Sequence, residues 1–171
     1  QYQTDYVYHA QIEPLNATVW VKEKGNSAEV WVGTQAASAS LRAVAKATGI
    51  VPEKIKVHRA MLGGAFGRRS IQEMDFLDDA AWLSMQLGKP VKVIWTREDD
   101  VASGWFKPMS AHLLRATVET DGKISAWHHR VAAQEPLATA EPYIYEKIGQ
   151  EPVVAMPGTE HHAYEFPLQL A

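Results

Sequence analysis

The sequence of 171 residues contains no cysteine. It therefore offers no disulfide, no thiolate nucleophile and no cysteine ligand for zinc or an iron–sulfur cluster. Its formal net charge of −3 gives no general attraction to nucleic acid or acidic membranes, and we expect no nucleic-acid partner. No apolar run approaches the roughly 20 residues that span a bilayer. What remains is an ordinary globular composition, with 46% hydrophobic and 22% charged residues.

The length is sufficient for one domain with its own hydrophobic core, so we expect a single domain over residues 1–171. The sequence starts with Gln1 instead of methionine, and its final residues, EFPLQLA, form neither a polar tail nor a helix cap. We therefore expect an excised piece of a longer polypeptide, with processing or renumbering as the alternative. After about Pro136 the regular pattern fades, and we expect residues 136–171 to form an extended tail.

Alternating apolar and polar residues predict two β-hairpins. The first covers residues 17–34 and turns at Gly25–Asn26. The second covers residues 112–134 and turns at Asp121–Gly122.

Apolar residues at helical spacing predict two helices, over residues 38–48 and 71–87, and a glycine follows each of them. The stretches KIKVHRAML (54–62) and PVKVIWT (90–96) predict single strands. The second is short and β-branched, and we expect it to be central in its sheet. The predicted order is ββαβαβββ. Hairpins combined with crossovers are typical of an α+β fold, here a mixed β-sheet with two packed helices.

The stretch MLGGAFGRRS, residues 61–70, follows the first of these single strands and is called here the glycine loop. Short side chains at a strand-to-helix turn let backbone N–H groups approach an anionic or oxygen-rich ligand. The loop lacks the Lys-Ser/Thr ending of a nucleotide-binding P-loop and the glycine spacing of the dinucleotide fingerprint. On its own it fits a phosphate-binding loop and a purely structural tight turn about equally well.

Gln35 ends the second strand of the first hairpin, where sheets often place ligand-binding side chains. Together, EVWVGTQ, GIVPEKIKVHRAMLGGAFGRR and WTREDDV form a pattern that resembles the molybdenum-binding large subunits of the xanthine dehydrogenase and aldehyde oxidase family. The stretches HAQIEPLNATVWV and PGTEHHAYEFP are similar in particular to the isoquinoline 1-oxidoreductase β-subunit and to membrane-associated aldehyde dehydrogenase large subunits.

The resemblance implies that the intact enzyme holds molybdenum in a molybdopterin cofactor, in its simple or its cytosine dinucleotide form. It implies that the Gln35 amide and the backbone N–H of Phe66 lie beside an oxygen ligand of the metal. Small residues would admit the flat cofactor, and the Phe66 ring would exclude water. The other cofactor-binding residues that it implies are Gly63, Gly64, Ala65, Gly67 and Arg68.

Two arginines close the glycine loop and have two candidate partners. Arg68 and Arg69 could meet the phosphates of a dinucleotide cofactor. They could equally pair with Glu73 and Asp75 of the next helix, and we favour this pairing.

Two departures from the purine-oxidising relatives indicate the substrate class. Where those relatives carry a glutamate this sequence has Ser70, and where they carry an arginine it has Phe106, two residues before Pro108. We expect Ser70 and Phe106 to line a pocket for an apolar N-heterocycle or an aldehyde, and not for xanthine. The family's catalytic glutamate lies near the C-terminus of the large subunit. We therefore expect no catalytic residue in this chain and no activity from it alone.

The partners implied by the resemblance are the remainder of the large subunit and a small [2Fe–2S] subunit, with a cytochrome c subunit as an open addition. The compartment is bacterial cytoplasm or periplasm, with the periplasm favoured. Because this family holds its cofactor between two lobes, we expect the isolated chain to bind none tightly. A non-catalytic scaffold domain is the alternative to an enzyme.

The seven histidines include two adjacent pairs, His128–His129 and His161–His162. Neighbours on a strand point to opposite faces, so one site cannot readily use both members of the first pair. The second pair falls in a predicted loop and could bind zinc or nickel. For both pairs we favour solvated or hydrogen-bonded histidines.

Overall fold

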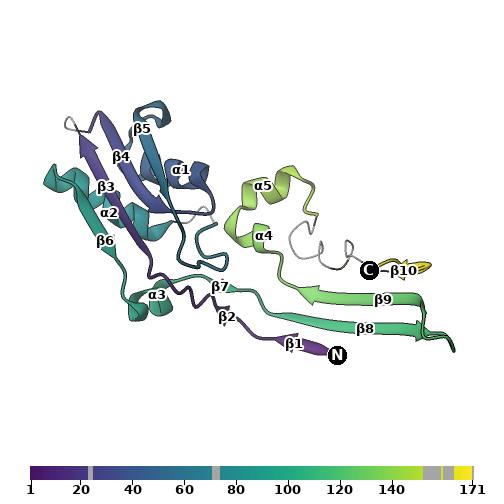
Figure 1. Cartoon of the computed structure of the whole chain (residues 1–171). Helices are drawn as coiled ribbons and strands as arrows, with labels where there is room; N and C mark the ends of the chain where they lie inside the picture. Colours follow the sequence, from purple (N-terminus) through teal and green to yellow (C-terminus); the bar gives the residue numbers. More distant parts are fainter. Residues whose placement is uncertain (23–24, 71–73, 152–158, 160–163, 171) are drawn as a thin grey trace. The chain divides into compact units, whose positions relative to one another are not determined.

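The computed structural model describes residues 1–22, 25–70, 74–151, 159 and 164–170, and the chain forms two compact units (Figure 1). The core unit is Tyr8–Trp105. The hairpin unit combines Gln1–Val7 with Phe106–Ala171. A compact unit is not by itself an independently folding domain, so the single domain expected over residues 1–171 stays a prediction.

The core unit contains a four-stranded sheet in the order β5-β4-β3-β6. The strands are β3 (Asn16–Lys22), β4 (Ser27–Gly33), β5 (Ile55–Ala60) and β6 (Val91–Ile94). β3 is antiparallel to β4 and β6, whereas β4 and β5 are parallel. The sheet is therefore mixed, and the first predicted hairpin is confirmed, with Gly25 N–H donating to Lys22 O at 2.9 Å.

The expectation that the 90–96 segment is central in its sheet is wrong. Within the described part of the chain β6 pairs with β3 alone and forms one edge. Its side chains alternate between half-buried and exposed positions, as an edge strand allows. A short β-branched run has the same local pattern at an edge as in the centre, so it does not reveal which neighbours a strand has.

Two helices, α1 (Ala37–Thr48) and α2 (Asp75–Leu87), pack against each other and on the sheet (Figure 1). Each is followed by a glycine in the left-handed conformation, Gly49 at φ 74° and Gly88 at φ 62°, as predicted. Residues 71–73 of the second predicted helix lie outside the described residues. The largest fully buried apolar side chains of this unit are Leu15, Val19, Val30, Val32, Val44, Met74, Phe76 and Leu77.

The hairpin unit contains a second sheet in the order β1-β8-β9-β10. Its strands are β1 (Tyr2–Thr4), β8 (Ser110–Val118), β9 (Ile124–Ala133) and β10 (Leu168–Leu170). β8 and β9 are the second predicted hairpin, which is confirmed. The tail differs from the expectation: α4 (Pro136–Ala140) and α5 (Pro142–Lys147) are short helices, each with a proline in its first turn, a position that tolerates the missing N–H.

The eight predicted elements occur in the expected sequence, but the predicted single sheet is wrong because β8 and β9 belong to a second one. The pattern also missed the short strands β1, β2 (Val7–Tyr8), β7 (Phe106–Lys107) and β10, the 3₁₀ helix η1 (Pro52–Lys54) and the helix α3 (Arg97–Ser103). α3 starts with a capping box between Thr96 and Asp99 that is readable in the sequence.

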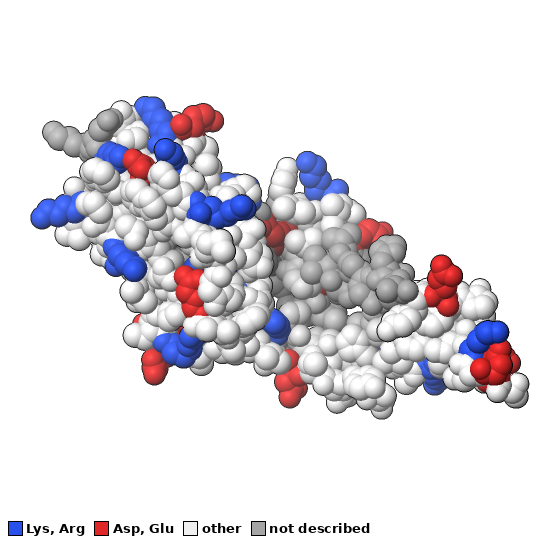
Figure 2. All heavy atoms as spheres, in the orientation of Figure 1, with Lys and Arg blue, Asp and Glu red and all other residues white. Residues whose placement is uncertain are grey.

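No helix among the described residues is long and apolar enough to cross a membrane. On the face drawn in Figure 2, basic and acidic side chains are interspersed and do not gather by sign.

Candidate functional site

The glycine loop and Gln35 lie at the same edge of the core unit's sheet. β4 and β5 are parallel neighbours that end at Gly33 and Ala60, which are paired in the ladder. Gln35 follows the end of β4, and the glycine loop follows the end of β5. The carboxyl ends of neighbouring parallel strands are a common place for ligand sites.

Three residues of the glycine loop have positive φ angles. They are Gly64 at 97°, Phe66 at 50° and Gly67 at 104°. Phe66 is strained there because an L-residue with a bulky side chain rarely adopts this conformation. Its side chain is 54% exposed, whereas the neighbouring Ala65 is buried. Strained residues of this kind cluster at ligand-binding sites.

Two side chains from outside the glycine loop accept hydrogen bonds from loop N–H groups on either side of residues 64–66. Glu13 Oε2 accepts the N–H of Gly63 at 2.7 Å, and Gln35 Oε1 accepts the N–H of Gly67 at 3.2 Å. Between them, the N–H groups of Gly64, Ala65 and Phe66 donate no hydrogen bond to any residue that the structure describes. Three consecutive unpaired donors form a cradle for an oxygen-rich or anionic group.

Gln35 is exposed and is held at both its backbone and its side chain. Its N–H donates to Arg69 O at 3.0 Å, and its Oε1 is the acceptor for Gly67. The side-chain NH₂ remains as a donor beside the glycine loop. The resemblance assigned this amide the role of donor, and that role stays a prediction.

Arg68 is fully buried and pairs with the carboxylate of Asp75, at 3.0 and 3.1 Å from Nη2. Its Nε lies 3.4 Å from Oδ1 of Asp100, which is 1% exposed. Its backbone N–H donates to Ala65 O at 3.0 Å. The favoured pairing with Asp75 is confirmed. Arg68 thus supports the glycine loop from the interior, and its predicted contact with a cofactor stays a prediction.

Arg69 is also fully buried, and its partners differ from those of Arg68. It donates to Gly33 O at 2.8 Å and to Pro14 O at 2.7 Å, and its Nη2 lies 3.3 Å from Glu13 Oε1. Burial lowers the pKa of Arg69, and the charge of Glu13 opposes this shift. The expected partner Glu73 lies outside the described residues. Neither guanidinium is exposed, so neither is placed to meet a phosphate at the surface of this unit.

Asp100 joins Arg68 to the start of the core unit. Its Oδ2 accepts hydrogen bonds from Tyr8 Oη and Gln11 Nε2. Burial raises the pKa of Asp75, although Arg68 opposes the shift, and burial together with the Asp100 hydrogen bond raises the pKa of Tyr8. The glycine loop therefore lies on a buried layer of paired charges. The sequence did not reveal Glu13 and Asp100, because their partners are distant in the chain. Glu13 contacts Gly63 and Arg69, 50 and 56 residues further along, and Asp100 contacts Arg68, 32 residues earlier.

The two expected substrate-pocket residues lie in different units. Ser70 belongs to the core unit, where its Oγ donates to Gly67 O at 2.6 Å. Phe106 belongs to the hairpin unit and is exposed. The shared pocket stays a prediction.

Of the histidine pairs, only the first is described. His129 Nε2 lies 3.0 Å from His112 Nδ1, and His112 Nε2 lies 3.0 Å from Ser110 Oγ. Among the described residues no group of three or more His, Cys, Asp or Glu side chains could hold a metal ion. His161–His162 lies outside the described residues.

Residues 1–150 match the family model for the molybdopterin cofactor-binding domain, and the chain belongs to this family, as the sequence predicted. Over 169 residues it is 40% identical to isoquinoline 1-oxidoreductase subunit beta of Brevundimonas diminuta, covering 98% of this chain and 21% of that protein. It is 33% identical over 165 residues to the membrane-bound aldehyde dehydrogenase [pyrroloquinoline-quinone] of Gluconacetobacter polyoxogenes, covering 94% and 21%. The chain thus spans about a fifth of the length of these relatives.

The crystal structure of quinoline 2-oxidoreductase from Pseudomonas putida 86 superposes with a TM-score of 0.58 at 23% identity, covering 77% of this chain and 16% of that one. At this identity the likeness shows the fold alone. The mixed α/β arrangement is therefore shared with a part of a much larger protein.

Proposed function

We propose that this chain forms one wall of a molybdopterin site in a larger oxidoreductase subunit. The intact enzyme oxidises an aldehyde or hydroxylates an N-heterocyclic aromatic, with water as the source of oxygen. The observation that carries the proposal is the row of unpaired N–H donors at Gly64, Ala65 and Phe66, held between the Glu13 and Gln35 side chains. Family membership supports it.

The residues at the glycine loop fit such a cofactor. An oxygen-rich, flat group needs donors without a bulky side chain in front of them, and two of the three donor residues are Gly64 and Ala65. When bound, the molybdenum centre would supply two-electron redox chemistry with oxygen transfer. The chain's own part is to donate hydrogen bonds from these N–H groups and from the Gln35 amide, and to exclude water with the Phe66 ring.

Our proposal concerns the pterin part of the cofactor. Both arginines of the glycine loop are used internally, so this unit supports the pterin end of either the simple or the cytosine dinucleotide form. Because the chain has no cysteine, iron–sulfur clusters that accept the electrons would be bound outside it. A small [2Fe–2S] subunit and a cytochrome c subunit are the partners that we propose.

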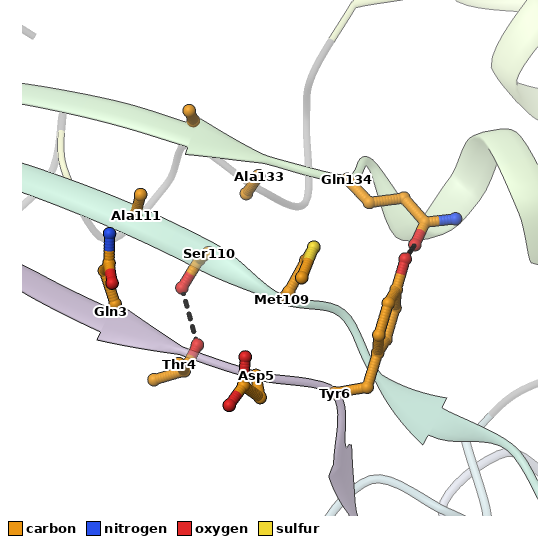
Figure 3. A pocket seen from close by; sticks show the side chains of 10 residues that line it. Gln3, Thr4, Asp5, Tyr6, Met109, Ser110, Ala111, Ala133 and Gln134 are labelled. Carbon is orange, nitrogen blue, oxygen red and sulfur yellow. Dashed lines mark hydrogen bonds between the residues drawn. The ribbon is translucent and has the colours of Figure 1, made fainter.

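The surface of the hairpin unit supports packing against the remainder of a larger subunit. No apolar side chain of this unit is fully buried among its described residues. A pocket of about 540 Å³ lies on this unit. Figure 3 shows it, with the Tyr6 ring and Met109 beside small residues of β8 and β9. Tyr6 Oη donates to Gln134 Oε1 at 3.2 Å across one end of it. Exposed apolar surface of this kind marks interaction sites.

A loop variant in the intact subunit tests the proposal. Gly64→Ala places a Cβ at φ 97°, which costs an L-residue roughly 1–2 kcal/mol, and relief of this strain would move the N–H cradle. We expect about 5- to 30-fold weaker retention of molybdenum and pterin, measured by elemental analysis and pterin fluorescence. The matched control is Gly122→Ala, at φ 86° in the β8–β9 turn with nothing within 4 Å of its Cβ, and it should keep wild-type content. Equal content in both variants would refute the proposed site.

A double variant tests the proposed substrate class. Ser70→Glu with Phe106→Arg introduces the two charges of purine-oxidising relatives, and each costs several kcal/mol if it is buried unpaired. We expect kcat/KM for isoquinoline or an aromatic aldehyde to fall by at least about tenfold, without efficient oxidation of xanthine. Ser70→Ala with Phe106→Leu is the apolar control and should retain most activity. If the charged variant oxidises its native substrate at the wild-type rate, the two residues do not line the pocket.

A further inference from the structure

We infer that Glu13 is a positioning residue that sets the donor geometry of the glycine loop, an inference that rests on the proposed function. One carboxylate contacts the loop on both sides of the three unpaired donors. Its Oε2 accepts the N–H of Gly63, at 2.7 Å, and its Oε1 lies 3.3 Å from Arg69 Nη2. The entry and the exit of the cradle are thereby tied to a single side chain.

The close approach of Glu13 explains why residue 63 is a glycine. A Cβ at Gly63 would lie 3.0 Å from Glu13 Cβ and 3.3 Å from Glu13 Oε2. Such contacts are shorter than side chains normally tolerate, so a larger residue would displace the carboxylate or the loop. Because the N–H of Gly63 is already used, the structure gives this residue a supporting role, and the donors open to a ligand start at Gly64.

Arg69 links the same carboxylate to the strand that carries Gln35. Its guanidinium donates to the carbonyl of Gly33, the last residue of β4, and to the carbonyl of Pro14, next to Glu13. A Cβ at Gly33 would lie 3.1 Å from Arg69 Nη1, so a side chain at residue 33 would press on this guanidinium. Gln35 is two residues beyond Gly33. The Glu13–Arg69 pair therefore fixes the distance between the Gln35 amide and the N–H cradle.

The charge of Glu13 suits this role. Burial by itself would raise its pKa, but hydrogen bonds from Gly63 N–H, Asn16 and Arg69 outweigh burial and hold the pKa below its usual range. Glu13 is therefore ionised at neutral pH, and Arg69 compensates the negative charge that would otherwise face an anionic ligand in the cradle. The Glu13 carboxylate therefore holds the loop, and because Arg69 balances its charge, it does not repel an oxygen-rich group in the cradle.

Three variants of the intact subunit separate positioning from stability. Glu13→Ala removes both loop contacts, Glu13→Gln keeps an acceptor for Gly63 N–H, and Asp75→Asn removes the charge paired with Arg68 without touching the three donors. All three should lower the thermal unfolding midpoint, because each leaves a buried arginine less well paired.

Only Glu13→Ala should speed the loss of molybdenum and pterin from the subunit. We expect a roughly 10- to 100-fold effect, which is the effect of losing a hydrogen bond to a charged group. Glu13→Gln should restore most of the retention.

Hydrogen exchange of the Gly63 N–H, which donates to Glu13 Oε2, supplies a readout that does not need the cofactor. It should quicken in Glu13→Ala and return toward wild type in Glu13→Gln. If Glu13→Ala retains its cofactor and its loop protection, or if Asp75→Asn loses both to the same extent, Glu13 has no positioning role. If the wild-type subunit contains no molybdenum, the proposed function fails, and the exchange result still decides whether Glu13 fixes the loop.

Discussion

Replacing Gln35 with alanine in the intact subunit is expected to lower turnover by about 10²–10³, the usual effect of removing one donor that stabilises developing charge. Gln35 is the side chain best placed for this, since its oxygen is held by Gly67 N–H at 3.2 Å and its NH₂ remains as a donor. Molybdenum content should fall much less than the rate, because the three backbone donors of the cradle remain.

Two further variants make the Gln35 result specific. Gln35→Glu keeps an acceptor for Gly67 N–H but has no amide donor when ionised, so its turnover should fall as in the alanine variant. Gln86→Ala, at an exposed position of α2, should behave as wild type. The measurement is steady-state kinetics together with metal analysis of the same preparations. An alanine variant with wild-type rate and wild-type molybdenum would show that Gln35 does not act at the metal.

Removal of the Asp100 carboxylate should give the largest loss of stability. Asp100 is 1% exposed, accepts from Tyr8 and Gln11, and lies 3.4 Å from Arg68, which is itself fully buried. Breaking a buried ion pair on one side typically costs about 3–5 kcal/mol, a large share of the roughly 5–15 kcal/mol that stabilises a typical domain. Asp100→Ala should lower the free energy of unfolding by that amount.

The neighbouring residue provides the control for this measurement. Asp99 is exposed and caps α3 through Thr96, so Asp99→Ala should cost only about 1 kcal/mol. Urea unfolding of both variants, followed by tryptophan fluorescence, gives the comparison. Equal midpoints for the two variants would mean that Asp100 is not essential to the buried charge layer.

Local patterns predicted most of the elements that carry the site. Alternation and the Gly25 turn predicted the β3–β4 hairpin, and helical spacing with Gly49 and Gly88 predicted where α1 and α2 end. These features depend on residues close in sequence, so the sequence contains the whole signal. The positions of Gln35 and of the glycine loop, each directly after a strand, followed from the same local reading, whereas the parallel pairing of β4 with β5 did not.

Features set by distant partners could not be read in this way. β6 has the composition of a central strand but lies at an edge, because strand neighbours depend on the fold as a whole. Glu13 looks like any surface carboxylate in the stretch QIEPL. Its role arises from Gly63 and Arg69, 50 and 56 residues further along the chain. Buried charge pairs have no sequence period, so only the structure reveals them.

Diffraction from crystals of the intact subunit at the molybdenum absorption edge tests the central claim most directly. The proposed site predicts one anomalous peak per subunit, beside the N–H groups of Gly64, Ala65 and Phe66 and within reach of the Gln35 side chain. A molybdenum peak elsewhere in the subunit, or no peak in active enzyme, would contradict the claim that the glycine loop forms a wall of the cofactor site.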